Sequence, residues 1–224
     1  MPKTHPPKYL VTHRLIIVTR NPKDAAVSHF HHMKNKAEWD FDGDWNDFFD
    51  IVGDLHNTHA RSRSPPHKSW TAHSFFHRLT LLSRLQMMKG EIAHKDFFEW
   101  HMPWWERHQK GEINALWLHY EDMIEDLPAA VRKIANFMGK EDMSDEVVAS
   151  IADQSTLDSM KKNPKADCKW LPGSKHATEG HSMHLRKGGK GNWKDYFTEE
   201  QNKIFDEYMH KHLDGSGLEF DFGN

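Results

Sequence analysis

Residues 20–24, with the sequence RNPKD, have the residue types of an anion-binding site. They follow an apolar run whose composition and length predict a buried strand over residues 14–19. A strand that runs directly into a helix leaves free N–H groups and a positive dipole end at the helix start. The guanidinium of Arg20 beside that start favours phosphate as the bound anion.

The same stretch also predicts where the helix begins. Asn21 is a good N-cap, Pro22 suits the first helical position and Asp24 can reach back to the cap, so a helix is predicted over residues 22–34. A well-capped surface helix with a solvated arginine has the same residues. This stretch alone leaves both interpretations open.

A second cluster of phosphate-binding residue types lies at residues 185–194, with the sequence LRKGGKGNWK. Its three closely spaced glycines let backbone N–H groups approach an anion. Arg186 supplies a forked donor and Lys187 a point charge. A flexible basic loop is the alternative interpretation. No GxxxxGK[ST] pattern occurs in the chain, which argues against an intact ATPase or kinase.

The elements that must position these clusters alternate between strands and helices. A second strand is predicted over residues 115–120, and helices are predicted from Pro128, from Ser144 to about residue 152, over residues 155–162 and from Thr198 to about residue 213. This alternation is typical of an α/β fold with a parallel sheet, in which ligands gather at the carboxyl ends of the strands.

The composition excludes several functional classes. The 224 residues carry 30 Lys and Arg against 33 Asp and Glu, a net charge of −3, which gives no support to a nucleic-acid or membrane-surface role. The one cysteine, Cys168, allows no disulfide framework and suits a reducing compartment, so a cytoplasmic location is expected. Of the 19 histidines, His29 and His32 share a predicted helix face, but polar helix-face histidines are favoured over a metal site.

Six groups of residues, taken together, occur in an order that is known from one family. The groups are Lys3-Thr4-His5; residues 20–24 with Ser28; Tyr120-Glu121-Asp122-Met123; residues 160–164; residues 186–188 with 191–194, Phe197 and Thr198; and residues 215–218. In these groups the chain resembles the cytosolic sulfotransferases, which use 3′-phosphoadenosine 5′-phosphosulfate (PAPS). The likeness covers residues 1–51 and 87–224.

The resemblance implies a single α/β sulfotransferase domain over residues 1–224, with a parallel-sheet fold like that of the P-loop NTPases. It implies transfer of a sulfuryl group from PAPS to a hydroxyl or amine of a small acceptor such as a phenol, alcohol or amine. The product nucleotide is 3′-phosphoadenosine 5′-phosphate (PAP), and no metal is needed. The alternative is a catalytically inactive nucleotide-binding or structural module of the same fold.

The resemblance also implies residue roles. Arg20 and Ser28 are expected to bind the 3′-phosphate of the nucleotide. Three residues are expected to close over the same phosphate: Arg186, Lys187 and Gly188. The adenine contacts are expected from three positions: Tyr120, Ser155 in place of the usual threonine, and Leu157 in place of the usual stacking aromatic.

Two residues near the start of the sequence match the family's catalytic positions. His5 is expected to be the base that takes the proton from the acceptor, and its ordinary pKa near 6.5 suits that work. Lys3 is expected to stabilise charge on the sulfuryl group during transfer.

The chain also departs from the family pattern. The family's N-terminal strand and phosphosulfate-binding loop precede the Lys-Thr-His motif, and this chain begins two residues before it, so a truncated member with an exposed sheet edge is expected. Residues 52–86 are an atypical insertion that interrupts the pattern. Two interpretations of this insertion remain open: a retained intron and a genuine loop. Glu199 and Lys203 replace the usual residues of the dimer segment, so the oligomeric state stays open.

Overall fold

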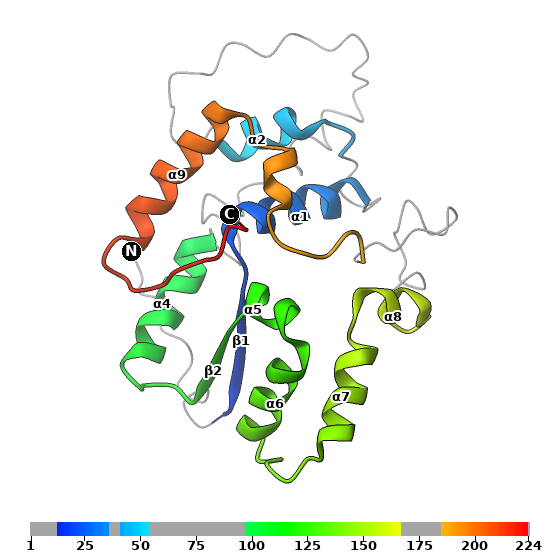
Figure 1. Ribbon diagram of the computed structural model, residues 1–224. Helices are drawn as coiled ribbons and strands as arrows, with labels where there is room; N and C mark the ends of the chain where they lie inside the picture. The colour runs from blue at the N-terminus through cyan, green and yellow to red at the C-terminus, as the bar shows by residue number, and fades with distance from the viewer. Residues whose placement is uncertain (1–12, 36–40, 54–96, 167–184, 224) are drawn as a thin grey trace.

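The computed structural model describes residues 13–35, 41–53, 97–166 and 185–223. Within these ranges lie two parallel strands, β1 (Leu15–Thr19) and β2 (Ala115–His119), side by side in the middle of Figure 1. Leu15 pairs with Ala115 and Thr19 with His119, so both strands end at the same level. This confirms the predicted α/β fold with a parallel sheet. The side chains that follow the two strands are therefore neighbours.

The prediction of a buried first strand is right for only one face of β1. Ile17 and Thr19 are buried, but Ile16 and Val18 are 42% and 46% exposed. An apolar run of five residues has the same appearance whether one face or both faces are covered, which is why the sequence could not distinguish the two cases.

Helices follow the strands along the chain. Their bounds are α1 (Pro22–Asn35), α2 (Trp45–Gly53), α4 (Phe97–Gln109), α5 (Tyr120–Glu125), α6 (Leu127–Phe137), α7 (Asp145–Gln154), α8 (Leu157–Lys162), the short 3₁₀ helix η4 (Asn192–Asp195) and α9 (Glu199–Leu213). In Figure 1, α1, α2 and α9 lie beyond the carboxyl ends of the strands, and α6 and α7 run side by side below.

The predicted caps explain several of these boundaries. Ser144 accepts a hydrogen bond from the backbone of α7, and Thr198 forms a capping box with Gln201 at the start of α9. The helix predicted from residue 155 begins two residues later, at Leu157, because the side chain of Thr156 accepts from Ser159 N at 3.3 Å.

An aromatic core holds α1 against α2, α4 and α9. Phe30 of α1 lies in the middle of it, with its ring 5.6 Å from that of Trp45 and nearly perpendicular to it. Phe98 of α4 and Phe205 of α9 close the cluster. Edge-to-face aromatic contacts add to the burial of apolar area, so α1 is held firmly against these helices.

The predicted insertion at residues 52–86 lies outside the described residues except for its first two positions, which end α2. No helix within the described part of the chain is long and apolar enough to cross a membrane.

Candidate anion-binding site at the strand ends

Arg20 occupies the junction between β1 and α1. Its guanidinium stacks on the ring of Tyr120, with Cζ 4.6 Å from the ring centroid, and its Nη2 donates to the carbonyl oxygen of Gly189 at 3.1 Å. Its Nε atom is buried and finds no hydrogen-bond acceptor among the described residues. A buried donor left unpaired is costly, so this N–H is a candidate donor to an anion at the strand end, next to the glycine-rich loop (residues 185–194).

Asn21 fixes the backbone directly after Arg20. Its side-chain oxygen accepts from Asp24 N at 2.9 Å, which is the predicted N-cap. Its own backbone N–H donates to Glu121 Oε1 at 2.9 Å. Glu121 is 1% exposed and lies just after β2, so a buried carboxylate from one strand end holds the peptide at the other.

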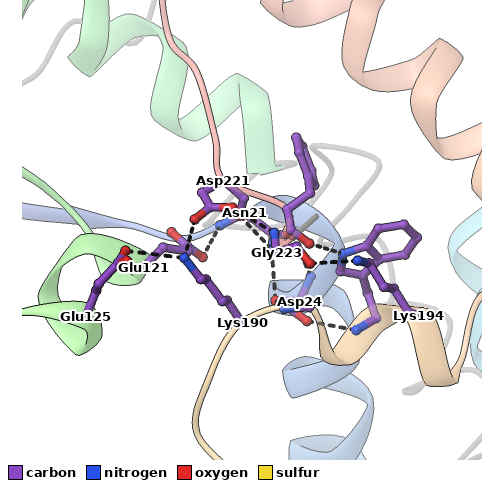
Figure 2. Close-up of polar contacts among 11 residues, drawn as sticks. Asn21, Asp24, Glu121, Glu125, Lys190, Lys194, Asp221 and Gly223 are labelled. Carbon is purple, nitrogen blue, oxygen red and sulfur yellow. Dashed lines mark hydrogen bonds and ion pairs between the residues drawn. The ribbon is translucent and has the colours of Figure 1, made fainter.

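Asp24 reaches back to the cap residue as predicted, and it also joins α1 to the glycine-rich loop. The carboxylate reaches Asn21 through the side-chain amide, at 2.8 Å. The carboxylate also accepts hydrogen bonds from the backbone N–H groups of Gly191 at 2.7 Å and Trp193 at 2.8 Å. Asp24 is 1% exposed, so these charged hydrogen bonds are shielded from water. The two clusters recognised in the sequence are thus connected by one carboxylate (Figure 2).

Lys23 secures the same helix start from the other side. Its side chain is buried, pairs with Asp206 at 2.5 Å and donates to Asn202 at 2.6 Å. Its ammonium also lies 4.3 Å from the ring centroid of Trp193. Both acceptors belong to α9, so this helix and the loop are tied to the residue next to Asp24.

The glycine-rich loop approaches Arg20 closely. Gly188 has a φ of 65°, and a Cβ placed on it would lie 3.1 Å from Leu157 Cδ2. A larger residue there would meet both a strained backbone and a neighbouring side chain. Leu157 thus lies beside Gly188, and the adjoining Gly189 contacts Arg20, which stacks on Tyr120.

The two cations of this loop have different environments. Lys187 donates to Asn192 Oδ1 at 3.0 Å and pairs with Asp195 at 3.2 Å. Arg186 is half-buried and close enough to α1 to act on His31. The pKa of His31 is lowered to about 4, first by burial and then by the positive charges of Arg186 and Lys34.

Ser28 and His31 are three residues apart on α1 and so share a helix face. Ser28 is exposed on that face. Ser155 follows α7, and its hydroxyl donates to Ile151 O at 2.8 Å. The structure thus brings Arg20 next to Tyr120 and Gly189, and Leu157 next to Gly188. The roles expected for Ser28 and Ser155 stay predictions.

The predicted catalytic residues His5 and Lys3 lie outside the described residues. Within the described ranges, no group of three or more His, Cys, Asp or Glu side chains could hold a metal ion.

Sequence reasoning missed several residues of the site. Glu121 was recognised only as part of a motif, and the exposed pair of Lys190 with Asp221 at 2.6 Å was not predicted. An acidic residue directly after a predicted strand could have indicated Glu121. The pair of Lys190 with Asp221 joins exposed residues 31 positions apart and leaves no local pattern.

The sequence model of the sulfotransferase domain matches residues 2–217. Sulfotransferase 1B1 of Canis lupus familiaris is 32% identical over 207 residues, which are 92% of this chain and 57% of that protein. Sulfotransferase 1C2 of Rattus norvegicus is 27% identical over 216 residues, which are 96% of this chain and 60% of that protein. The chain thus spans less than two thirds of the length of these curated relatives.

Solved structures agree with these relatives. Mouse sulfotransferase SULT7A1 complexed with PAP is similar with a TM-score of 0.62 and 26% identity, over 91% of this chain and 59% of that one. Retinol dehydratase in complex with androsterone and inactive cofactor PAP has a TM-score of 0.61 at 23% identity, over 96% and 51%, a likeness that shows the fold alone. Because the domain model matches nearly the whole sequence, the chain belongs to the sulfotransferase domain family.

Proposed function

We propose that this chain binds the 3′-phosphate of PAPS between Arg20 and the glycine-rich loop, and that it transfers the sulfuryl group to a hydroxyl or amine of a small molecule. The observation that carries the proposal is the buried, unpaired Nε of Arg20 at the ends of two parallel strands. A phosphate is the anion with enough acceptors and charge to satisfy this donor together with Arg186 of the glycine-rich loop.

The residues around Arg20 fit such a ligand. Gly189 has open space around it, since a Cβ placed there would meet nothing within 4 Å. Lys187 is exposed, and its pairing with Asp195 is screened by water, so it is free to turn toward an arriving phosphate at small cost. Tyr120 and Leu157 supply apolar surface next to the phosphate site, where we place the adenine.

Catalytic roles come from the family resemblance. His5 is proposed to take the proton from the acceptor hydroxyl as it attacks the sulfur, and Lys3 to stabilise the negative charge on the transferring group. We place the activity in the cytoplasm, because a chain with Cys168 as its one cysteine suits a reducing compartment.

The experiment that tests the proposal measures turnover and binding on the same preparation. The chain is incubated with PAPS and a panel of phenols, alcohols and amines, PAP release is followed, and PAP affinity is measured by calorimetry. We expect turnover that His5→Ala removes while PAP still binds. Turnover that survives His5→Ala would reject the assigned base.

Two other outcomes are equally informative. Binding of PAP without turnover on any acceptor would favour the alternative, a nucleotide-binding module that transfers nothing. Failure to bind PAP would reject the site itself.

A further inference from the structure

The segment that follows α9, residues 218–223, returns to the start of α1, and we call it the return segment. Figure 1 shows it in red, passing α4 and ending beside the blue start of α1. Leu218 anchors its beginning, being 4% exposed. Its last three residues, 221–223, make polar contacts with the glycine-rich loop and with α1. No residue of this segment after Leu218 belongs to the sequence groups that pointed to a nucleotide site.

Asp221 pairs with Lys190 in the middle of the glycine-rich loop. Lys190 Nζ lies 2.6 Å from Asp221 Oδ2 and 3.3 Å from Glu125 Oε2 at the end of α5. Figure 2 shows Lys190 between these two carboxylates. The hydrogen bonds that Lys190 donates to Asp221 and then to Glu125 raise the pKa of Lys190, and accepting the Lys190 hydrogen bond lowers the pKa of Asp221.

The backbone of the return segment accepts hydrogen bonds from the other side of the loop. Trp193 Nε1 donates to the carbonyl oxygen of Phe222 at 2.9 Å, and Lys194 Nζ donates to that of Gly223 at 2.6 Å. On α1, Asn21 Nδ2 donates to the carbonyl oxygen of Asp221 at 3.3 Å. The segment therefore bridges the loop and the residue next to Arg20.

Two glycines make this close contact possible. Gly191 and Gly223 have φ values of 79° and 70°, and a Cβ on Gly223 would lie 3.0 Å from both N and Cα of Gly191. The contact is between two backbones, so neither side can yield as a flexible side chain would. Gly191 is also the residue whose N–H donates to Asp24. A shift of Gly223 would therefore displace Gly191 and disturb its hydrogen bond to Asp24, which holds the loop to α1.

We propose that Asp221 and Gly223 are positioning residues, which hold the glycine-rich loop in the place from which it binds the 3′-phosphate. This inference rests on the proposed function. Three glycines within residues 188–191 give the loop many alternative conformations, and ordering them would otherwise weaken binding. The return segment orders the loop before the nucleotide arrives.

The two residues contribute in different ways. Lys190 and Asp221 have side chains 34% and 43% exposed, so their attraction is partly screened by water and weakened by salt. The backbone contact of Gly223 with Gly191 does not depend on salt. The ion pair selects the loop's orientation, and the glycine contact sets its distance from α1.

The test compares two nucleotides that differ only in the 3′-phosphate: adenosine 3′,5′-bisphosphate and adenosine 5′-monophosphate. Affinities for the full chain are measured by calorimetry, together with thermal unfolding. Asp221→Asn should weaken bisphosphate binding by about two- to fivefold, the scale of an exposed ion pair, with monophosphate binding unchanged. Gly223→Ala should weaken it by about tenfold, because the loop is displaced. Glu219→Gln, an exposed charge loss in the same segment, is the matched control and should change neither affinity.

Salt and a conservative variant separate positioning from general stability. At 0.5 M salt the difference between wild type and Asp221→Asn should shrink, whereas the Gly223→Ala loss should persist. Asp221→Glu should restore most of the selectivity for the bisphosphate. An equal loss for both nucleotides, or an unchanged ratio in both variants, would overturn the inference. A wild-type chain that does not prefer the bisphosphate would overturn the proposed function and this inference with it.

Discussion

Replacing Asp24 by Asn should loosen the connection between α1 and the glycine-rich loop. The carboxylate accepts three hydrogen bonds, two on Oδ2 from Gly191 N and Asn21 Nδ2 and one on Oδ1 from Trp193 N. An amide oxygen can keep the first two, but its NH₂ group then faces the N–H of Trp193. One charged hydrogen bond, about 1.5–3 kcal/mol, is lost and two others become neutral, which removes about 1 kcal/mol each. The expected loss is about 3.5–5 kcal/mol of unfolding free energy.

Urea unfolding followed by tryptophan fluorescence measures this loss, since a lower midpoint at an unchanged slope reports stability alone. Asp142→Asn is the matched control, because Asp142 is an exposed residue that loses the same charge. Nucleotide titration of the folded variant should show weaker binding of adenosine 3′,5′-bisphosphate as well. If Asp24→Asn unfolded at the wild-type urea concentration, the hydrogen bonds of Asp24 would not be what joins the two clusters, and the reasoning would be refuted.

Three further predictions concern pH, a buried cation and the base pocket. Burial, followed by the charge of His32, lowers the pKa of His29 to about 4, so the unfolded chain binds more protons between pH 6.5 and 4 and stability falls as the pH drops. In His29→Gln, the free energy of unfolding should fall by about 2–3 kcal/mol less than in wild type between pH 7 and pH 4.5. Urea midpoints at the two pH values measure this, and a shift as large as that of wild type would contradict the prediction. Lys23→Met should lower the free energy of unfolding by about 1–3 kcal/mol, because Asp206 loses its partner. Thermal unfolding would detect this loss, and an unchanged melting temperature would argue against the prediction. Leu157→Phe should tighten binding of adenosine 3′,5′-bisphosphate by about 1 kcal/mol through stacking, as seen by calorimetry, and an unchanged affinity would place the base elsewhere.

Local patterns in the sequence were sufficient for the elements that carry the site. The apolar run and the cap residues predicted β1 and the start of α1, and Asn21 does cap Asp24 N. Thr198 predicted the start of α9, where it forms a capping box with Gln201. Such signals involve residues within a few positions of one another, so they can be recognised without knowledge of the fold.

Contacts between distant residues could not be predicted in this way. Asp24 was expected to reach back to its own helix cap, yet two of its hydrogen bonds come from residues more than 160 positions away. A buried carboxylate accepts hydrogen bonds from the donors that tertiary packing places next to it, and local sequence patterns do not predict that packing. The two arginine clusters were each recognised, but their connection through Asp24 and the return segment appears only in the folded chain.

A double-mutant cycle on Arg20 and Arg186 tests the central claim, that both clusters bind one phosphate. The affinity for adenosine 3′,5′-bisphosphate is measured for wild type, Arg20→Ala, Arg186→Ala and the double variant, with adenosine 5′-monophosphate as the comparison ligand. Each single change should weaken the binding free energy of the bisphosphate by about 1.5–3 kcal/mol, the scale of a charged hydrogen bond, and leave that of the monophosphate unchanged. The two losses should be coupled by at least about 0.5 kcal/mol, because the residues share a ligand group. Losses that simply add, or that are equal for both nucleotides, would contradict a shared 3′-phosphate site.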